Sequence, residues 1–409
     1  MSGSAPLAHL RVLDLSRVLA GPWAGQVLAD LGAEVIKIER PGEGDDTRSW
    51  GPPWLKDAAG RETRESAYYL ACNRGKKSVT VDISRREGQD IVRALAARSD
   101  ILLENFKVGA LARYRLAYPD LRSLNPGLIY CSISGFGQDG PYRDRAGYDF
   151  MIQAMGGLMS ITGEPDSAPG GGPLKVGVAI ADLMTGMYAA TGVLAALARR
   201  ALTGRGEHLD LALLDVQVAM LANQAMNYLV SGTAPERLGN AHPNIVPYQA
   251  FRTRDGNIVL AVGNDRQFAR FCEIAGQPAL ASDPRFATNA ARVRHRAALV
   301  PRIAELMAGR RTAEWVAALE EAGVPCGPIN TLDQVFADPQ VRHRGLRIEA
   351  EHPEAGSVPL VASPLRFPGA PPRDCSPPPG LGQHTGEVLE ELLGLAPERI
   401  RALRSDGVI

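Results

Sequence analysis

The sequence lacks an excess of charge of either sign. Its 409 residues include 45 lysines and arginines and 45 aspartates and glutamates, so the formal net charge is zero. Proteins whose main surface binds nucleic acid usually carry a basic excess, so the balance argues against that class. It leaves room for a local basic pocket that binds a small phosphorylated ligand. The fractions of hydrophobic residues, 45%, and charged residues, 22%, are typical of a globular protein. The length indicates about two or three domains.

Cysteines and metal-ligand patterns are also scarce. The five cysteines, at positions 72, 131, 272, 326 and 375, are far apart and odd in number, which argues against a disulfide framework. No Cys-x-x-Cys pair occurs and the seven histidines show no ligand spacing, so we expect no metal site. The motifs G-x-S-x-G, H-E-x-x-H and Walker A are missing as well.

Long hydrophobic runs and targeting signals are missing too. The longest nearly apolar run, Leu183–Ala198, is bounded by Asp182 and Arg199 and is predicted to be too short to span a bilayer. The N-terminal stretch Met-Ser-Gly-Ser-Ala-Pro lacks the charged and apolar regions of a signal peptide. The sequence therefore predicts a reduced cytoplasmic protein that binds neither membranes nor nucleic acid.

Strand and helix patterns alternate over the first half of the chain. Short apolar, partly β-branched runs are typical of buried strands, and helical patterns separate them. The predicted strands are Leu10–Leu15, Glu34–Glu39, Ser78–Ile83, Ile101–Phe106, Leu128–Ile133 and Leu209–Leu214. The predicted helices include Gly21–Leu31, Arg86–Arg98, Ala181–Arg200 and Val216–Leu229. Strands separated by helices pair in parallel, so we expect an α/β fold with a doubly wound sheet.

The pattern changes near residue 232. Pro247–Thr253 and Asn257–Val262 flank Asp255-Gly256, which predicts a β-hairpin, and helical patterns follow it. We therefore place a smaller α+β domain at 232–325, between a large domain at 1–231 and a C-terminal part at 326–409. The C-terminal part contains strand patterns at Leu346–Glu351 and Ser357–Leu360, a proline-rich link at 371–379, and helical patterns at Glu387–Leu393 and Pro397–Leu403.

Asp182 is a carboxylate at the start of the apolar helix predicted at Ala181–Arg200. An aspartate at such a position is most often an N-cap, whose side chain only satisfies backbone N–H groups. The alternative is an activated carboxylate, which the helix N-terminus keeps ionised and an apolar surround leaves poorly hydrated and nucleophilic. The residues alone leave both interpretations open, and the N-cap is the commoner one.

Other candidate features are basic, glycine-rich or polar. Asn73-Arg-Gly-Lys-Lys-Ser78 places three cations in a turn, which is either a solvated loop or a clamp for phosphate groups. Arg40 directly follows a strand, at the carboxyl edge of the sheet, where open α/β sheets bind ligands. Gly135-Phe-Gly-Gln-Asp-Gly140 is not followed by a helical pattern, so it indicates a turn rather than a nicotinamide site. His242, in a polar loop, is a candidate substrate contact.

Several motifs, in order along the whole chain, resemble the class III CoA-transferases. That family includes formyl-CoA and carnitine CoA-transferases and the α-methylacyl-CoA racemases. The motifs are Val12–Pro22, Leu31–Arg40, Gly44–Arg48, Glu104–Phe106, Ala181–Gly186, Thr203–Gly206 and Leu381–Thr385. Within the family, four stretches are most similar to members that transfer CoA from succinyl-CoA to glutarate or hydroxymethylglutarate. These stretches are Gly51–Pro53, Asn73–Ser78, Arg145–Asp149 and Asn244–Phe251.

The resemblance implies a fold that sequence patterns cannot show. Each chain would have a Rossmann-like large domain built from both chain ends and a smaller central domain, and two chains would interlock as a homodimer. The resemblance also implies that Asp182 is the nucleophile, which reverses the N-cap interpretation. It would form a mixed aspartyl anhydride and then an aspartyl-CoA thioester, with backbone N–H groups stabilising the oxyanions. No metal and no permanently bound cofactor is implied, because CoA enters as a substrate.

The resemblance further implies a CoA site. The matching residues are Arg40, Asn105, Phe106 and Arg113 along the CoA, Val18, Leu19 and Ala20 near the pantetheine and thioester, and the active-site aromatic Tyr148. Arg40, Arg113 and the 73–78 loop are expected to form a local positive site for the CoA phosphates. Leu19 and Ala146 replace a glutamine and a lysine of formyl-CoA transferase, and its glycine-rich lid is missing. Formate or oxalate chemistry is therefore not expected.

We expect an acyl-CoA:carboxylate CoA-transferase that uses succinyl-CoA and a dicarboxylate such as glutarate or hydroxymethylglutarate. Candidates for binding the acceptor's distal carboxylate are Arg17, Asn240 and His242. One alternative is a 2-methylacyl-CoA racemase of the same family, which needs a histidine where this chain has Tyr148. A phenol, with an ordinary pKa of about 10, is a poor general base near neutral pH. The other alternative is a non-catalytic CoA-binding protein, against which the intact Asp182 with its flanking glycines argues.

Overall fold

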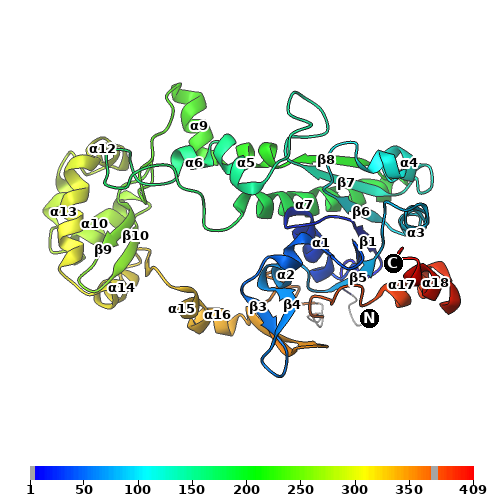
Figure 1. Ribbon diagram of the computed structural model, residues 1–409. Coiled ribbons are helices and arrows are strands. Elements are labelled where there is room, and N and C mark those ends of the chain that lie inside the picture. The colour runs from blue at the N-terminus through cyan, green and yellow to red at the C-terminus, as the bar shows by residue number, and fades with distance from the viewer. Residues whose placement is uncertain (1–4, 370–375) are drawn as a thin grey trace. The chain divides into compact units, whose positions relative to one another are not determined.

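The computed structural model describes residues 5–369 and 376–409, which divide into two compact units (Figure 1). The first unit comprises the chain up to Gly157, Val176–Ala225 and Gln340–Ile409. The second comprises Leu158–Lys175 and Met226–Pro339. The second unit is larger than the domain expected at 232–325, because it also includes 158–175 and extends to Pro339. Pro371 and Pro372 of the predicted link, and Cys375, lie outside the described residues.

The first unit is built on a six-stranded parallel sheet with the strand order β5-β2-β1-β6-β7-β8 (Figure 1). The strands are β1 (Arg11–Asp14), β2 (Glu34–Glu39), β5 (Lys76–Thr80), β6 (Ile101–Glu104), β7 (Ile129–Ser134) and β8 (His208–Ala212). Each overlaps a predicted strand, and the expected α/β fold with a parallel central sheet is confirmed. The central strands β1, β6 and β7 are buried on both faces and mostly apolar, which is why they could be recognised in the sequence.

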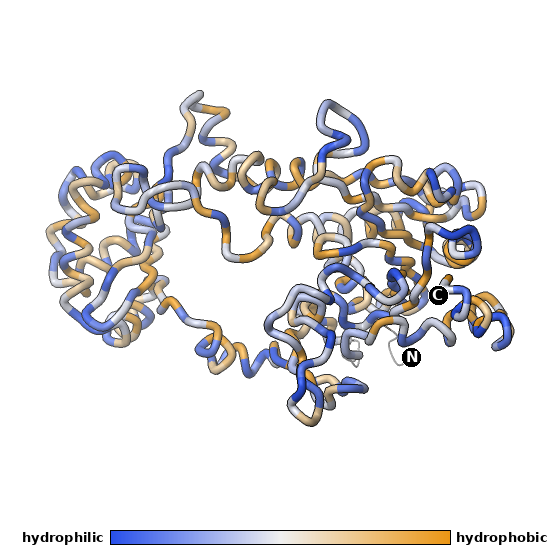
Figure 2. Tube along the Cα trace, in the orientation of Figure 1, coloured by the Kyte–Doolittle hydropathy of each residue, from blue (hydrophilic) through white to orange (hydrophobic). Residues whose placement is uncertain are grey.

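Helices cover both faces of this sheet. One apolar cluster joins the strands to α1 (Ala20–Asp30), α5 (Asp149–Met155), α7 (Ile180–Thr203) and α8 (Leu213–Ala219). The other joins them to α3 (Arg86–Ala96), α4 (Tyr118–Arg122), α17 (Thr385–Leu393) and α18 (Pro397–Ser405). Val12 belongs to the first cluster and Leu13 to the second, because successive strand residues face opposite sides. Figure 2 shows that hydrophobic residues are concentrated in these strands, whereas the loop between β7 and α5 is mostly hydrophilic.

The helix α7 corrects one expectation. It has 24 residues and, by length and composition, it is a candidate membrane span, whereas the apolar run within it appeared too short. Its buried residues, such as Ala189 and Val193, belong to the apolar cluster of the sheet. Gly186 allows close packing on α1, since a Cβ there would lie 2.7 Å from the Ala20 carbonyl oxygen.

The helix predicted at Val216–Leu229 is divided in two. The structure has α8 and then α9 (Ala222–Ser231). The chain turns at Ala222, whose φ of 47° is left-handed and incompatible with a continuous right-handed helix. The apolar spacing continues across this turn, and no glycine or proline marks it, so the sequence pattern predicted one helix.

The C-terminal part of the chain lies along the open edge of β5. The Gly75 N–H donates to the Ser376 carbonyl oxygen at 2.9 Å, and the His384 N–H donates to the Ser78 carbonyl oxygen at 2.9 Å. The Thr80 N–H donates to Thr385 Oγ1 at 3.0 Å. The motif Leu381–Thr385 therefore covers an edge strand, and α17 and α18 then complete one face of the core.

The second unit has a three-stranded antiparallel sheet with the order β11-β10-β9. Its strands are β9 (Tyr248–Arg252), β10 (Asn257–Ala261) and β11 (Cys326–Pro328). The predicted hairpin is confirmed, with Asp255-Gly256 in its turn. The helices that share its apolar cluster are α10 (Asp265–Ile274), α11 (Ala279–Ser282), α12 (Asn289–Arg294), α13 (Arg296–Ala308) and α14 (Thr312–Glu321). That cluster is drawn entirely from residues 246–326.

Shorter elements complete the two units. Two antiparallel hairpins belong to the first unit, and the second of them confirms the strands predicted at Leu346–Glu351 and Ser357–Leu360. The hairpins are β3 (Trp54–Lys56) with β4 (Glu62–Ser66) and β12 (Arg347–His352) with β13 (Gly356–Val361). The remaining helices are η1 (Asp46–Ser49), α2 (Ala67–Cys72), η2 (Leu111–Tyr114), α6 (Leu158–Ile161), α15 (Leu332–Ala337) and α16 (Pro339–His343).

Candidate active site

A cavity of about 470 Å³ lies at the carboxyl ends of β1, β2, β5 and β6. This is the edge at which open α/β sheets bind ligands. Three of the residues expected from the sequence, Arg17, Arg40 and Phe106, line it together with Lys37 and Asp45. The strand ends therefore bring together side chains that are up to 89 positions apart in the chain.

The two arginines of this cavity form exposed ion pairs. Arg40 Nη1 lies 2.9 Å from Glu43 Oε2, and Arg17 Nη1 lies 2.8 Å from Asp46 Oδ2. Exposed pairs contribute about 0–1 kcal/mol each, so either guanidinium can exchange its carboxylate for a phosphate at little cost. Arg113 is exposed on η2 and does not line the cavity, although Tyr114 beside it does.

Asn105 holds the loop that follows β1. Its Oδ1 accepts the Arg17 N–H at 2.9 Å, and its Nδ2 donates to the Arg17 carbonyl oxygen at 2.6 Å. The ring centroid of Phe106 lies 5.7 Å from the Arg17 guanidinium carbon. Asn105 does not itself line the cavity, and its observed contact is with the protein backbone.

The loop residues Val18, Leu19 and Ala20 lead from the cavity into α1. Val18 has a left-handed backbone, with a φ of 71°. Leu19 is the N-cap residue of α1 and provides no side-chain cap. Within residues 5–369 and 376–409, the N–H groups of Leu19 and Ala20 form no hydrogen bond. Unsatisfied N–H groups at a helix N-terminus favour anionic atoms.

Asp182 lies in the first turn of α7, but it does not cap the helix. The N-cap residue is Ala179, and the capping oxygen comes from Asp149. Asp149 Oδ1 accepts the Ala181 N–H at 2.8 Å and the Asp182 N–H at 3.3 Å. In the described part of the chain, the Asp182 carboxylate itself accepts no hydrogen bond and forms no ion pair. The N-cap interpretation is therefore wrong.

Burial raises the pKa of Asp182 to about 7, and the charge of Asp149 contributes to the increase. Burial therefore opposes the ionised form that the helix N-terminus is expected to favour. The ionised form has few polar partners. A poorly solvated carboxylate of this kind is a better nucleophile than one in water.

One tyrosine, Tyr68, lies near this carboxylate, and another, Tyr148, adjoins the capping residue Asp149. Tyr148 is the N-cap residue of α5, directly before Asp149, and is 66% exposed. Burial raises the pKa of Tyr68 on α2 to about 12, and the charges of Asp182, Cys72 and Asp149 act in the same direction. Nothing in the sequence marks Tyr68. Asp149 belongs to a quoted motif, but its capping role depends on a helix that begins 31 residues later.

The cavity and Asp182 are connected through the Val18–Ala20 loop. The Ala20 carbonyl oxygen lies against Gly186, about one helical turn after Asp182. Arg17, at the other end of the loop, lines the cavity. The loop therefore reaches from the cavity to the first turns of α7.

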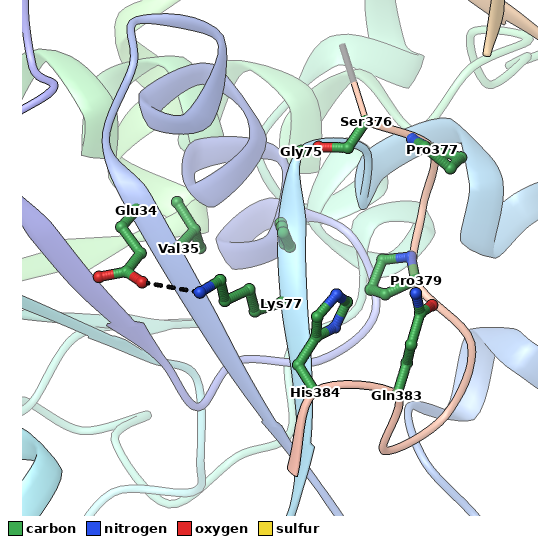
Figure 3. Close-up of a pocket in the computed structure, with 10 residues that line it drawn as sticks. Glu34, Val35, Gly75, Lys77, Ser376, Pro377, Pro379, Gln383 and His384 are labelled. Carbon is green, nitrogen blue, oxygen red and sulfur yellow. Dashed lines mark ion pairs between the residues drawn. The ribbon is translucent and has the colours of Figure 1, made fainter. Parts of the chain in front are cut away.

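A second cavity, of about 160 Å³, lies where β2 and β5 begin, at the opposite edge of the sheet (Figure 3). Lys77 lies between two carboxylates there, with Nζ 3.1 Å from Glu34 Oε1 and 2.7 Å from Glu387 Oε1. His384 lines the same cavity and accepts the Ser78 N–H at Nδ1.

The other cations of the 73–78 turn are also paired. Arg74 pairs with Asp30, and Lys76 Nζ lies 2.9 Å from Asp14 Oδ2 with both side chains fully buried. All three cations are therefore neutralised by protein carboxylates, away from the edge that carries Arg40. The expected contribution of this turn to a phosphate clamp is wrong, because the turn precedes β5 and a ligand site at the carboxyl edge follows the strands.

Asn240 and His242 belong to the second unit, whereas Asp182 belongs to the first. His242 Nδ1 accepts the Asn244 N–H at 3.0 Å, and burial and the Arg296 charge lower the pKa of His242. Neither residue is therefore among the first-unit residues that surround Asp182. Among the described residues, no group of three or more His, Cys, Asp and Glu side chains could hold a metal ion.

The sequence pattern of CoA-transferase family III matches residues 7–385. The chain belongs to this family. It is 52% identical to a succinate–glutarate CoA-transferase of Agrobacterium fabrum, over 95% of this chain and 96% of that one. It is 45% identical to the human succinyl-CoA:glutarate CoA-transferase, over 100% of this chain and 91% of that one. The crystal structure of a CAIB/BAIF family protein from Brucella suis is similar, with 50% identity, a TM-score of 0.83 and coverage of 95% and 100%.

The expected family is thus confirmed, and the chain is a family III CoA-transferase. Because the chain is a CoA-transferase, its substrates are an acyl-CoA and a carboxylate. Both ends of the chain contribute to the cavity-bearing unit of this CoA-transferase. The candidate site consists of the cavity, the Val18–Ala20 loop and the Asp182 carboxylate.

Proposed function

We propose that this enzyme transfers CoA from succinyl-CoA to a dicarboxylate, with glutarate as the first acceptor to test and hydroxymethylglutarate as the second. The relative that is 45% identical is named for succinyl-CoA and glutarate, and the relative that is 52% identical is named for succinate and glutarate. The observation that carries the chemistry is the unpartnered, mostly buried carboxylate of Asp182 beside the loop that leads to the cavity.

The proposed reaction has four acyl transfers on Asp182. Its carboxylate attacks the succinyl-CoA carbonyl and expels CoA thiolate, which gives a mixed succinyl-aspartyl anhydride. The thiolate then attacks the aspartyl carbonyl, which releases succinate and leaves an aspartyl-CoA thioester. Glutarate attacks that thioester and expels the thiolate again, giving a glutaryl-aspartyl anhydride. The thiolate finally attacks the glutaryl carbonyl, which yields glutaryl-CoA and the free carboxylate.

The environment of Asp182 supports this role. A carboxylate without hydrogen bonds has no protein partners to lose when it becomes an acyl derivative. The free N–H groups of Leu19 and Ala20 are candidates for stabilising the oxyanion formed at each attack. The N–H groups of Ala181 and Asp182 are not, because they already donate to Asp149.

We assign CoA binding to the cavity and its surroundings. Arg40 and Arg113 would hold phosphates, Phe106 and the backbone near Asn105 would contact the CoA, and Tyr148 would lie near the thioester. Arg17, Asn240 and His242 are the candidates for the acceptor's distal carboxylate. CoA is a substrate in this scheme, and no resident cofactor or metal takes part.

We also propose a cytoplasmic, interlocked homodimer. Exposed apolar side chains on α7, namely Met187, Tyr188, Leu194 and Leu202, support burial against a second chain. Light scattering coupled to size exclusion should give twice the chain mass of 43.7 kDa. A monomer mass would contradict the proposed assembly without affecting the proposed chemistry.

The proposed reaction is tested by a donor-by-acceptor screen. Succinyl-CoA and acetyl-CoA are each combined with glutarate, hydroxymethylglutarate, malate and itaconate, and the CoA products are quantified by mass spectrometry. We expect succinyl-CoA with glutarate to give the highest kcat/KM and Asp182→Asn to reduce it by about 10³-fold or more. Near-normal turnover of the variant would reject the mechanism.

The two alternatives have their own outcomes in the same experiments. A 2-methylacyl-CoA racemase would incorporate solvent deuterium at the α-carbon of 2-methylacyl-CoA, and we expect no incorporation because Tyr148 replaces the required histidine. A non-catalytic CoA-binding protein would bind succinyl-CoA and transfer nothing to any acceptor.

A further inference from the structure

Val18 holds an unfavourable backbone conformation at the start of the site loop. It is one of three non-glycine residues with positive φ among residues 5–369 and 376–409, together with Arg115 and Ala222. Its φ is 71°, and it is the only one of the three whose side chain is β-branched. A β-branched residue is a genuine outlier in this region, so surrounding contacts must hold it there.

Two side chains hold the peptide unit between Arg17 and Val18 from its two ends. Asn105 Nδ2 donates to the Arg17 carbonyl oxygen at 2.6 Å. The Val18 N–H donates to the Asp45 carboxylate, at 3.2 Å from Oδ1 and 3.3 Å from Oδ2. A peptide unit bonded at both its C=O and its N–H resists rotation, and this orientation restricts φ of Val18.

Asp45 is itself held by buried groups. Lys37 Nζ lies 2.8 Å from Asp45 Oδ2, with both side chains fully buried, and it also donates to the Ser16 carbonyl oxygen at 2.8 Å. Thr47 donates to Asp45 Oδ1 through its N–H at 2.9 Å and its hydroxyl at 2.8 Å. Burial alone would raise the pKa of Asp45, but the Lys37 charge and the Thr47 hydrogen bonds lower it to about 2. The carboxylate is therefore charged and fixed in orientation.

The conformation at Val18 determines the course of the residues that follow it. The unpaired N–H groups of Leu19 and Ala20 come directly after Val18, and the Ala20 carbonyl oxygen lies against Gly186 of α7. Rotation at Val18 would redirect both N–H groups relative to Asp182. A misplacement of about 1 Å can reduce catalysis by about 10²-fold.

We propose that Asp45, fixed by Lys37 and Thr47, is a positioning residue for CoA transfer that keeps Val18 left-handed and so directs the Leu19 and Ala20 N–H groups toward the reacting carbonyl. The inference rests on the proposed function, since it assumes that acyl transfer takes place beside this loop. It assigns a role to the Gly44–Arg48 motif, whose first carboxylate accepts the Val18 N–H of the loop backbone.

A double-mutant cycle tests the proposal, because glycine adopts a φ of 71° without strain. Asp45→Asn should lower kcat by about tenfold or more in the wild-type background and by less than about twofold in the Val18→Gly background. Asp45 is one of the residues that line the cavity, but asparagine keeps its shape, so KM for succinyl-CoA should change less than kcat. Equal losses in both backgrounds, or an unchanged kcat in the Asp45→Asn single variant, would overturn the proposal.

Thr47→Val is a gentler second variant if Asp45→Asn does not fold. It removes one hydrogen bond to Asp45 Oδ1 and keeps the side-chain volume, and its kcat loss should again disappear in the Val18→Gly background. Asp57→Asn is the matched control. Asp57 also accepts two backbone N–H groups in a loop, from Ala59 and Arg61, but it does not touch the site, so its kcat should stay at the wild-type value.

A readout independent of turnover separates this inference from the proposed function. Amide hydrogen exchange over residues 14–21 should accelerate in Asp45→Asn and Thr47→Val. Unchanged protection there would overturn the proposal that Asp45 holds the loop. The proposed function requires that the wild type transfers CoA and that Asp182→Asn does not. If both hold and Val18→Gly still fails to suppress the loss of kcat caused by Asp45→Asn, only the positioning role of Asp45 is rejected. If the wild type transfers no CoA to any acceptor, the proposed function is rejected, and the positioning role of Asp45 is rejected with it.

Discussion

Asp182 differs from an ordinary surface carboxylate because its side chain is mostly buried and, among the described residues, accepts no hydrogen bond. Its position at the start of an apolar helix was evident from the sequence, but its freedom from hydrogen bonds was not. That freedom exists because Asp149, 33 residues earlier, caps the helix instead. A capping partner so far away in the sequence depends on tertiary packing, which local patterns do not contain.

The raised pKa of Asp182 makes the stability of the protein depend on pH. Its folded-state pKa of about 7 lies above the ordinary value of 3.8, so folding is disfavoured as pH rises through this range. We expect Asp182→Asn to raise the free energy of unfolding at pH 8 by about 1–3 kcal/mol. The gain should be small near pH 4, increase up to about pH 7 and remain constant above it, as measured by urea denaturation.

The control for this experiment is Asp144→Asn, which changes a carboxylate that is 85% exposed. It should give no gain that grows with pH. A lower stability of Asp182→Asn at pH 8 would show that the carboxylate forms a stabilising interaction, contrary to the geometry described above.

At the scale of elements, the packing of α1 on α7 determines where the loop and the carboxylate meet. A Cβ at Gly186 would lie 2.7 Å from the Ala20 carbonyl oxygen and 3.0 Å from the Trp23 side chain. Because the nearest atom belongs to the backbone, we expect Gly186→Ala to push the helices apart and to lower the free energy of unfolding by about 1–3 kcal/mol. Thermal denaturation measures this change, and kcat should fall with it.

Gly192, on the same helix, offers a matched control. A Cβ there would lie 3.5 Å from Leu209 Cδ1, which is an ordinary contact. We expect Gly192→Ala to be neutral or to stabilise the helix by up to about 1 kcal/mol. If both substitutions had the same effect, the close approach at Gly186 would not be important for packing.

Elements were predictable where their signal is local. The central strands β1, β6 and β7 could be recognised because burial on both faces makes them mostly apolar, whereas β2 and β8 show alternation of apolar and polar residues. The break between α8 and α9 could not be predicted, since it occurs at Ala222 without a glycine or proline. The pairing of the 73–78 cations could not be predicted either, because their carboxylate partners come from elements that are distant in the sequence. These elements are β1, α1, β2 and α17.

At the scale of the whole molecule, the two units differ in how their cores are assembled. The apolar cluster of the second unit is contained within residues 246–326. We therefore expect a fragment of residues 226–339 to fold alone and to unfold cooperatively in circular dichroism. Trp315→Ala should lower its free energy of unfolding by about 3–5 kcal/mol, because this buried ring is central to the cluster.

A fragment of residues 1–225 should not fold in the same way. It lacks Val388, Leu389, Ile400 and Leu403, which belong to one face of the core in the first unit. A fragment 1–225 as stable as the full chain would contradict this description. The inclusion of 158–175 in the second unit was not predicted, because the glycine- and proline-rich composition of this segment indicates a loop without showing which unit it packs on.

The hydrogen bonds between the C-terminal part and β5 have a consequence for biosynthesis. The ribosome makes β5 long before the segment that covers its edge, with more than 290 residues between them. Until then, the nascent chain exposes an unpaired strand edge and an incomplete apolar face, which are the features that promote aggregation. We expect the second unit to fold during this interval, whereas the first unit can be completed only after translation has passed α18. The interval before that point is therefore when the chain should be most prone to aggregation.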